Sequence, residues 1–235
     1  MESDPIEPED FLIVGGHSGI GKRTVAYLRG MYPNAEFCVP KRDILDVRSH
    51  VEIQACVGRE GPFSHIVYSA GINELAWVDK ADLDVVLYDA MEVNCFGFAV
   101  LIGEHVRQFP AHRFSAVAVS SDAGQVPMRG SLAYCVSKAA LDMAVRQMAR
   151  ELAPECRINA VAPGIVDGTD MTKYIDETIP DFRGWTPEQA LDYERQGIPT
   201  GRRATLDEVA KTIAWVLMGP GQMTGAIIDI NGGRR

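Results

Sequence analysis

The sequence predicts a single α/β domain built on a doubly wound parallel sheet. Short apolar runs alternate with longer segments of helical spacing along nearly the whole chain. Most of the short runs are apolar throughout, as strands buried on both faces of a parallel sheet must be. No repeat, low-complexity segment or linker interrupts this alternation, so we assign residues 1–235 to one domain. Alternating strands and helices then predict an open sheet covered by helices on both faces.

The expected elements follow from the spacing of apolar residues. The strands are expected, in chain order, at Phe11–Val14, Glu36–Val39, His65–Ser69, Ala116–Ser120, Arg157–Ala162 and Ala226–Ile230. The helices are expected at Gly21–Met31, Ser49–Gly58, Ala81–Phe109, Ser131–Leu152 and Thr205–Met218. Residues 167–200 are rich in polar residues, Pro and Gly, with only short helical stretches. This segment is too long for an ordinary connection, so we expect a lid or binding loop there.

Composition narrows the class of protein. The chain has 46% hydrophobic and 23% charged residues, which is ordinary for a soluble globular protein. Its net charge of −9 argues against a nucleic-acid surface but leaves room for a small phosphate-bearing ligand. The start, MESDPIEPED, is acidic and proline-rich, unlike a signal or transit peptide, and the apolar runs are short, so no membrane span is expected. The five cysteines are scattered, so we expect reduced thiols, no metal site and a cytoplasmic protein.

A glycine-rich stretch, VGGHSGIGK from Val14 to Lys22, follows the first expected strand. Glycine costs conformational entropy on folding. It is usually found where the backbone needs a positive φ or where another group approaches the backbone closely. Between a strand and a helix, such residues let a pyrophosphate reach the backbone at the helix N-terminus. The spacing G-x-x-x-G-x-G differs from the usual dinucleotide pattern, and a tight turn with a helix cap is the alternative. Its place after the first strand favours a nucleotide site.

A tyrosine and a lysine share one face of the helix expected from Ser131. Tyr134 and Lys138 are at i and i+4, roughly 5–6 Å apart at Cβ. A free tyrosine has a pKa of about 10, and a lysine about 5 Å away favours its phenolate by roughly 3 kcal/mol. Ser121 ends an apolar strand, and strand ends in a parallel sheet open into the ligand crevice. An incidental pair is the alternative, but the three residues together predict a proton-transfer site.

In combination these motifs resemble the short-chain dehydrogenase/reductase family along essentially the whole chain. The matching segments are Gly15-x-x-x-Gly19-Ile20-Gly21, Asp46-Val47, Ala70-Gly71, Asn94 in EVNCFG, Ser121, Tyr134-x-x-x-Lys138, Asn159–Gly164 and Thr224–Gly233. The resemblance implies a Rossmann-like sheet and hydride transfer between a nicotinamide cofactor and a small-molecule carbonyl or secondary alcohol. It also implies a homotetramer or homodimer formed through the helices 81–109 and 131–152, whose apolar residues extend beyond one buried face.

The resemblance also implies roles for four catalytic residues. Tyr134 would be the general acid/base, and Lys138 would hold the nicotinamide ribose and lower the tyrosine pKa. Ser121 would hydrogen-bond the substrate oxygen, with Ser120 as a competitor that the family spacing disfavours. Asn94 would support a water that links Lys138 to solvent. The implied cofactor-binding residues are Gly15, His17, Ser18, Gly19, Ile20, Gly21, Lys41, Arg42, Asp46, Val47, Ala70, Gly71, Asn94, Tyr134, Lys138, Pro163, Gly164, Ile165 and Thr169.

The sequence departs from the family pattern at several points. Val14 stands where the family usually has a threonine, and YSAG at Tyr68–Gly71 replaces Asn-Asn-Ala-Gly. His17 has a second interpretation as a solvent-facing turn residue. The segment PGIVDGTDM is longer than the usual P-G-x-V-x-T, which shifts Thr169. Few residues separate Val39 from Asp46, so the helix that normally joins the second and third strands is predicted to be shortened or missing.

The residues after the second strand predict the choice of cofactor. An acidic residue there accepts hydrogen bonds from the adenosine ribose and selects NAD(H). Alignment with the family places Lys41 at this position with Arg42 beside it, and two cations can bind a 2′-phosphate. NADP(H) is therefore favoured. NAD(H) binding, with Asp43 turned inward to the ribose, is the alternative.

Two other functions are compatible with the same motifs. One is a cofactor-binding protein with a regulatory or scaffold role, and the other is an epimerase or dehydratase of the same family. The intact set of Asn94, Ser121, Tyr134 and Lys138 favours an active oxidoreductase. Epimerases and dehydratases of this kind commonly carry a larger C-terminal substrate domain, and no such domain follows Gly233 in this sequence.

Overall fold

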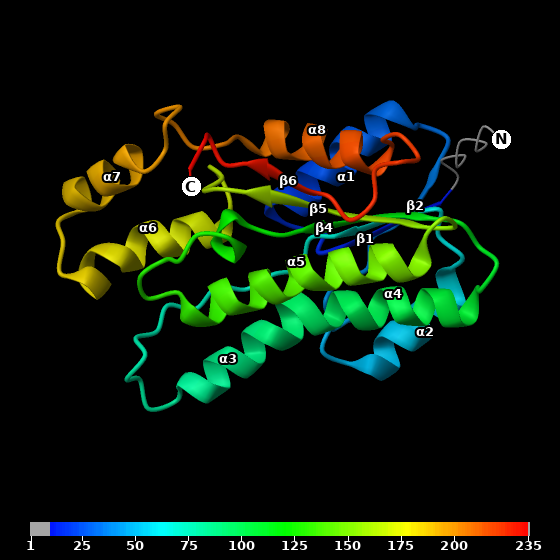
Figure 1. Cartoon of the computed structure of the whole chain (residues 1–235), viewed down its shortest axis with the longest axis horizontal. Coiled ribbons are helices and arrows are strands. Elements are labelled where there is room, and N and C mark those ends of the chain that lie inside the picture. The colour runs from blue at the N-terminus through cyan, green and yellow to red at the C-terminus, as the bar shows by residue number, and fades with distance from the viewer. Residues whose placement is uncertain (1–9, 235) are drawn as a thin grey trace.

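A computed structural model describes residues 10–234 of the chain. Six parallel strands form one sheet in the order β2-β1-β3-β4-β5-β6, which confirms the doubly wound, Rossmann-like fold (Figure 1). The sequence predicts that its first ten residues are not a signal peptide. Residues 1–9 of this segment lie outside the described residues, so that prediction stays a prediction. The strands are β1 (Asp10–Val14), β2 (Glu36–Cys38), β3 (His65–Tyr68), β4 (Ser115–Val119), β5 (Arg157–Pro163) and β6 (Ile227–Ile230).

Helices cover both faces of the sheet, and two more helices extend from one end of the molecule (Figure 1). On one face lie α1 (Gly19–Met31) and α8 (Leu206–Leu217), which pack against each other. On the other face lie α2 (His50–Glu60), α3 (Leu83–Met91), α4 (Gly97–Gln108) and α5 (Leu132–Leu152). The extension at the end of the molecule consists of α6 (Asp170–Arg183) and α7 (Pro187–Gln196).

The buried strand β1 shows why the sheet needs helices on both faces. Successive side chains of a strand point to opposite faces. Phe11 and Ile13 pack into the cluster that contains residues of α1 and α8. Leu12 and Val14 pack into the cluster that contains residues of α2, α4 and α5. The continuous apolar run in the sequence therefore fills two cores, as predicted for a central parallel strand.

The connection after β2 explains the short spacing between Val39 and Asp46. Residues 39–49 form turns, so no helix lies between β2 and Asp46. A helix of 11 residues, α2, nevertheless follows this turn and joins β2 to β3, the next strand of the sheet in chain order. The predicted loss of the helix between the second and third strands is therefore corrected by α2, and β2, only three residues long, lies at the edge of the sheet.

The long helix expected at 81–109 is continuous but not uniform. A π-helical turn, Glu92–Phe96, separates α3 from α4. The run Leu83–Gln108 is long and apolar enough to cross a membrane by length and composition alone. Half of its most apolar window is buried in the fold, as in the core helix of a soluble protein, because the run packs against α2 and α5. The expected absence of a membrane partner remains a prediction.

The segment 167–200 is more helical than the sequence predicted. It holds α6, of 14 residues, and α7, of 10, where only short helical stretches were expected. Thr169 and Thr186 cap the two helices by accepting hydrogen bonds from the backbone N–H three residues later. Pro180 lies inside α6. The expectation of a mostly irregular loop was therefore wrong, because the caps stabilise helices despite the polar composition.

Candidate active site

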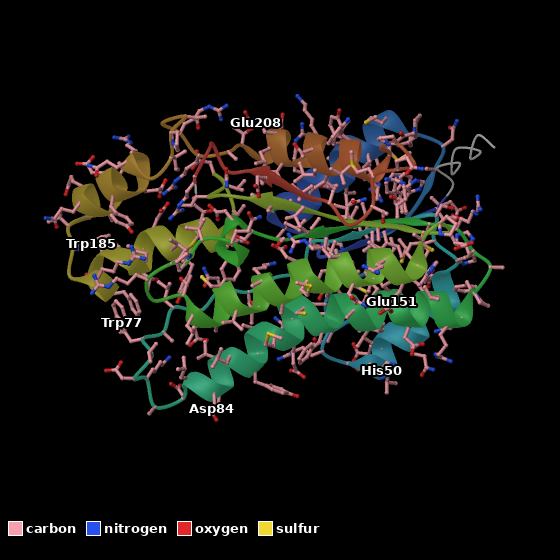
Figure 2. All side chains as sticks on the ribbon, viewed as in Figure 1. His50, Trp77, Asp84, Glu151, Trp185 and Glu208 are labelled. Atoms are coloured by element: carbon pink, nitrogen blue, oxygen red, sulfur yellow. The ribbon has the colours of Figure 1, made fainter. Side chains whose placement is uncertain are left out.

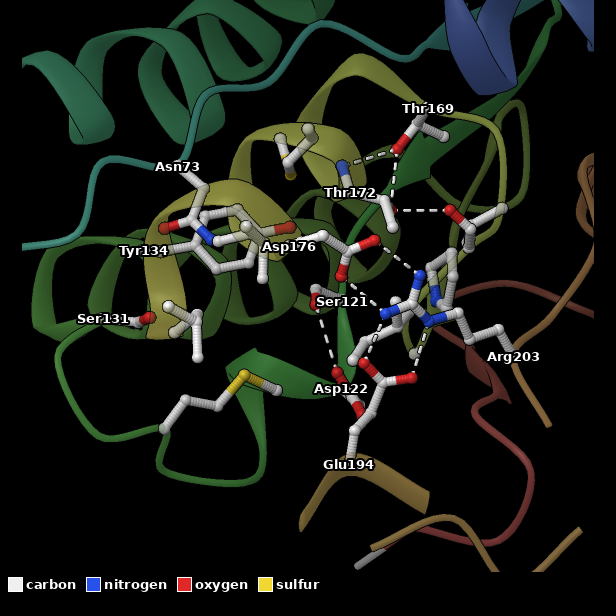
Figure 3. A pocket seen from close by; sticks show the side chains of 18 of the residues that line it. Asn73, Ser121, Asp122, Ser131, Tyr134, Thr169, Thr172, Asp176, Glu194 and Arg203 are labelled. Atoms are coloured by element: carbon white, nitrogen blue, oxygen red, sulfur yellow. Dashed lines mark hydrogen bonds and ion pairs between the residues drawn. The ribbon is translucent and has the colours of Figure 1, made fainter. Parts of the chain in front are cut away.

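A cavity of about 560 Å³ lies at the carboxyl ends of the strands, between the sheet and the two helices α6 and α7. Its lining includes Ser18 after β1, Ala70 after β3, Ser121 after β4 and Gly164 after β5. The strand order reverses between β1 and β3, and ligands of doubly wound sheets bind at this point. Figure 3 shows Ser121, Tyr134, Asp176 and Arg203 gathered in this cavity.

The predicted acid/base pair lies in the cavity wall on α5. Tyr134 is 9% exposed and Lys138 is 3% exposed. The Lys138 Nζ lies 5.7 Å from the centroid of the Tyr134 ring and donates a 2.9 Å hydrogen bond to the Val119 carbonyl. The pair therefore sits on one helical face, buried against the end of β4, as the i, i+4 spacing predicted.

The pKa of Tyr134 differs from the sequence-based expectation. Burial raises it to about 12, against a smaller lowering by a hydrogen bond with Ser121. Burial also lowers the pKa of Lys138 to about 8. Desolvation disfavours the charged form of each group, and neither pKa shift includes a contribution from the other group. The expectation that Lys138 lowers the tyrosine pKa is therefore not met in this structure, and Tyr134 is a protonated hydroxyl near neutral pH.

The two neighbouring serines after β4 have different partners. Ser121 begins the 3-10 turn Asp122–Gly124, where its Oγ accepts a 3.2 Å hydrogen bond from the Ala123 N–H. The Ser120 Oγ donates a 2.5 Å hydrogen bond to the Asp142 Oδ1 on α5. Both serines line the cavity, but the Ser120 hydroxyl is committed to Asp142. The Ser121 Oγ donates only at 3.3 Å, to the Asp122 Oδ1, so its hydroxyl is less firmly held than that of Ser120.

Asn94 is fully buried in the π-helical turn, beside the active site. Its Oδ1 accepts from the Ile72 N–H at 2.8 Å, and its Nδ2 donates to the Ile72 carbonyl and to the Ser137 Oγ, both at 2.9 Å. The Ser137 Oγ in turn donates to the Tyr134 carbonyl at 2.9 Å. Asn94 thereby ties the segment after β3 to the turn of α5 that carries Tyr134. The π-helical turn, a feature often found at functional sites, was not predicted from the sequence.

Tyr68 explains one departure from the family pattern. It replaces the first Asn of the usual motif, is fully buried, and donates a 2.6 Å hydrogen bond to the Val93 carbonyl in the π-helical turn. Its bulk and hydroxyl therefore fix the turn that holds Asn94. Ala70 and Gly71, the following residues of the motif, line the cavity as predicted.

The glycine-rich loop is shaped to receive a phosphate. Gly15 has a φ of +76°, and a Cβ there would lie 2.7 Å from the Ala70 backbone nitrogen. A Cβ at Gly21 would overlap the Gly15 carbonyl. The N-cap of α1, Ser18, makes no capping hydrogen bond, and the first turn carries no acidic side chain. The helix N-terminus thus leaves donors and its positive dipole end free, so the loop fits a cofactor pyrophosphate.

The residues expected at the adenosine end lie outside the cavity lining. His17 is exposed, and its Nε2 lies 2.9 Å from the Val39 carbonyl, which joins the glycine loop to the end of β2. Lys41 and Arg42 are exposed in the turn that follows. Asp46 pairs with Arg48 through contacts as short as 2.6 Å, and this bond lowers its pKa to about 2. Its carboxylate is therefore already occupied by a protein partner.

The cavity brings together most of the predicted site. The predicted residues in its lining are Ser18, Gly19, Ile20, Ala70, Gly71, Ser121, Tyr134, Lys138, Pro163, Gly164, Ile165 and Thr169. The predicted residues that it does not include are Gly15, His17, Gly21, Lys41, Arg42, Asp46, Val47 and Asn94. Val47 packs against the core cluster under the sheet. The Thr169 hydroxyl is used as the N-cap of α6, where it accepts from the Thr172 N–H at 3.0 Å.

Several lining residues were missed by the sequence analysis. The most connected is Arg203, which bonds Asp176 on α6 and Glu194 on α7 at 2.6 Å each and Asp167 at 3.3 Å (Figure 3). Arg129, Arg183 and Arg234 also line the cavity. An arginine has no spacing pattern of its own, so only the folded chain shows that these four meet. Within residues 10–234, no group of three His, Cys, Asp or Glu side chains could hold a metal ion.

Comparison with known proteins gives consistent matches. A family model described as "Enoyl-(Acyl carrier protein) reductase" matches residues 44–235. D-erythrulose reductase from Gallus gallus is 31% identical over 198 residues, covering 80% of this chain and 74% of the relative. Sorbitol-6-phosphate 2-dehydrogenase from Klebsiella pneumoniae is 29% identical over 206 residues, covering 80% of this chain and 77% of the relative.

Two solved structures share the fold over nearly their whole length. A short chain dehydrogenase family protein from Francisella tularensis superimposes with a TM-score of 0.82 at 24% identity, covering 96% of this chain and 98% of that one. Actinorhodin polyketide ketoreductase with NADPH superimposes with a TM-score of 0.81 at 24% identity, covering 99% of this chain and 98% of that one. At these identities the likeness shows the fold alone.

Proposed function

Because this chain belongs to the short-chain dehydrogenase/reductase family and is an oxidoreductase, we propose that it interconverts a small carbonyl compound and its secondary alcohol, with Tyr134 as the acid/base. The observation that carries the proposal is the meeting of Ser121, Tyr134 and Lys138 in one cavity, beside a helix N-terminus with free donors. The relatives include reductases and dehydrogenases of small carbonyl and alcohol compounds, which supports nicotinamide-dependent hydride transfer.

The side chains of this site manage the proton and the charge on oxygen. A bound nicotinamide cofactor supplies the hydride donor or acceptor, held by the glycine loop and Lys138. In the reductive direction, the protonated Tyr134 hydroxyl donates its proton to the carbonyl oxygen, and the Ser121 hydroxyl hydrogen-bonds the same oxygen. A donor pair placed where negative charge develops stabilises the transition state more than the ground state. The buried Lys138 ammonium offsets the phenolate that remains.

We further propose NADP(H) as the favoured cofactor. Lys41 and Arg42 are exposed just after β2, beside the expected adenosine ribose, and NADPH accompanies one structure of the same fold. NAD(H) is the alternative. We also propose a homotetramer or homodimer, because exposed apolar side chains such as Val85, Val136 and Met143 lie on α3 and α5.

The decisive test is Tyr134→Phe, because phenylalanine keeps the ring and removes the proton. We expect kcat to fall about 10²–10⁴-fold, the usual effect of losing a positioned acid/base. NAD(P)H absorbance against a panel of ketones and aldehydes measures turnover, and quenching of protein fluorescence by NADPH checks that cofactor still binds. Tyr27→Phe, on α1 and outside the cavity lining, is the matched control. Retention of more than about a tenth of the wild-type kcat would refute the role.

A further inference from the structure

The outer part of the cavity gathers arginines from three separate segments. Arg129 precedes α5, Arg183 ends α6, and Arg234 follows β6. The fourth arginine of the lining, Arg203, is neutralised by its three carboxylates. Among residues 10–234, neither Arg129 nor Arg183 has a carboxylate oxygen within 4.0 Å, and Arg234 only approaches Asp122 at 3.8 Å. Arg129 and Arg183 therefore stand without a carboxylate partner in the described part of the chain, whereas Arg234 has Asp122 beside it.

The arginines lie close enough to influence one another. The Arg183 Nη2 donates a 2.7 Å hydrogen bond to the Arg129 carbonyl. Burial lowers the pKa of Arg183, and the charges of Arg129 and Arg234 lower it further. The Arg183 Nε is buried and has no hydrogen-bond partner in the described part of the chain. Like charges held together with unused donors are stabilised when an anion enters between them.

Aromatic rings hold two of the guanidinium groups by their faces. The Arg183 Cζ lies 5.0 Å from the centroid of the Trp185 ring and 5.5 Å from that of Tyr193. The Arg129 Cζ lies 5.0 Å from the centroid of the Trp77 ring, which is itself stacked on Phe182. Figure 2 shows Trp77 and Trp185 at the same end of the molecule, beside α6. Each ring packs against the flat face of a guanidinium group. The N–H groups at the edge of the guanidinium then stay available to donate hydrogen bonds to a planar or tetrahedral anion.

The arginines begin next to the catalytic oxygen site. The Ser121 Oγ donates a 3.3 Å hydrogen bond to the Asp122 Oδ1, and the Asp122 Oδ2 lies 3.8 Å from the Arg234 Nη1. Apart from Asp122, the carboxylates of the lining are engaged or distant. Asp176 and Glu194 bind Arg203, and Asp170 lies at the far end of α6, about 20 Å from Arg183 along the helix.

We propose that the substrate of this enzyme carries an anionic group, a carboxylate or a phosphate, which Arg129, Arg183 and Arg234 bind. Its carbonyl or hydroxyl group lies at Tyr134 and Ser121 in the same cavity. This inference rests on the proposed function and adds the class of substrate. Anion recognition fits the arginine fork, which bonds carboxylate and phosphate oxygens in pairs.

Matched substrate pairs test the proposal by activity. A keto acid is compared with its methyl ester, and a ketose phosphate with the free ketose, at constant ionic strength. We expect kcat/KM to favour the anionic member of at least one pair by tenfold or more, about 1.4 kcal/mol. The pair that shows the preference identifies carboxylate or phosphate as the group. Equal or better use of the neutral member in both pairs would overturn the proposal.

A variant and its control locate the effect. Arg183→Gln should reduce the anionic-to-neutral ratio of kcat/KM about tenfold or more, since it removes the charge that both other arginines act on. Arg195→Gln changes the same residue type on the exposed face of α7, outside the cavity lining, and should leave the ratio as it is. An unchanged ratio in Arg183→Gln, or an equal loss in Arg195→Gln, would contradict the assignment.

A binding measurement separates this proposal from the proposed function. With NADPH bound, malonate should raise the melting temperature of the wild type, whereas neutral malonamide should not, and Arg183→Gln should lose the malonate effect. If malonate stabilises the wild type through Arg183 while no carbonyl compound is turned over, the anion site stands and the hydride-transfer proposal fails. If turnover occurs but malonate and malonamide act alike, the anion site fails alone.

Discussion

At the scale of single residues, burial has opposite consequences for the two groups of the acid/base pair. It raises the pKa of Tyr134 to about 12 and lowers the pKa of Lys138 to about 8, because each neutral form is favoured in a low-dielectric site. The hydroxyl is thereby kept ready to donate a proton. Lys138 keeps its charge only partly above pH 8, so its protonation couples to the stability of the fold.

This coupling predicts how stability changes with pH. Below pH 8 Lys138 is charged in both the folded and unfolded states, so the cost of burying it is fully present. Between about pH 8 and 10.5 the folded state releases the proton while the unfolded state still binds it, so stability rises with pH. From pH 7 to 10, the wild type should gain roughly 2–3 kcal/mol relative to Lys138→Met.

Urea unfolding of both proteins at pH 7 and pH 10 measures this difference. Using the difference between the two proteins cancels the titration of the other groups. A gap between wild type and Lys138→Met that stays constant over this range would show that Lys138 titrates normally. A gap that changes in the opposite direction would contradict the sign.

The charges beside β2 make a second prediction at this scale. Lys41 and Arg42 lie on an ordered turn, because the Lys41 carbonyl accepts hydrogen bonds from the backbone N–H groups of Ile44 and Leu45. Within residues 10–234, neither side chain has a carboxylate partner. They are free to bind a 2′-phosphate. We expect Lys41→Ala/Arg42→Ala to lower kcat/KM for NADPH at least about tenfold and to affect NADH much less.

Steady-state kinetics with both cofactors measures the preference. Arg59→Ala, in which the lost arginine pairs with Glu60 on α2, is a control for the loss of surface charge. A wild type that prefers NADH would favour the alternative in which Asp43 binds the ribose. An NADPH preference that is unchanged in Lys41→Ala/Arg42→Ala would also contradict the proposed role of these two cations.

At the scale of elements, the sequence predicted the helices and strands that are determined by interactions of neighbouring residues. The apolar run of β1 and the periodicity of α5 predicted these elements because each must bury its own side chains. The π-helical turn around Asn94 escaped prediction, since it depends on Tyr68, which is 25 residues away and bonds the Val93 carbonyl. The helix α7 had a recognisable sequence signal in Thr186, Pro187 and Gln189, which form a capping box with proline at the first helical position.

Arg203 joins α6 and α7, which we expect to act as a lid, and gives a prediction at this scale. It bonds both Asp176 on α6 and Glu194 on α7, and a lysine cannot make two forked pairs from one ammonium group. We expect Arg203→Lys to lower kcat/KM for the carbonyl substrate about tenfold, mainly through KM, because the lid closes less well over the cavity. The dissociation constant of NADPH should change little.

Arg202→Lys is the matched control, because Arg202 pairs with Glu208 at the start of α8 and does not line the cavity. Kinetics and cofactor titration of both variants separate lid closure from general damage. Equal losses in the two variants, or an unchanged KM in Arg203→Lys, would show that Arg203 does not control access to the site.

At the scale of the whole molecule, topology assembles what no single motif contains. The reversal of strand order between β1 and β3 places the ends of four strands around one cavity, so Ser18, Ala70, Ser121 and Gly164 meet although they are far apart in sequence. The family pattern predicted this meeting. It did not predict the arginines of the outer cavity, because none of them lies in a segment that matches the family pattern.

The outer face of the α3–α5 layer predicts assembly. Val136 and Met143 are seven residues apart on α5 and are 43% and 60% exposed, while Tyr88 on α3 is 60% exposed. Positions i and i+7 lie on one helical face, so these side chains form an apolar surface that a second copy of the chain would cover.

We expect the wild type to sediment as a homotetramer or homodimer at micromolar concentration. Val136→Glu/Met143→Glu should shift it toward smaller species, because burying two carboxylates is costly. Val51→Glu, at a 74% exposed position on α2, should leave the assembly unchanged. Circular dichroism confirms that each variant is folded. A wild-type monomer, or equal dissociation by the α2 variant, would refute this interface.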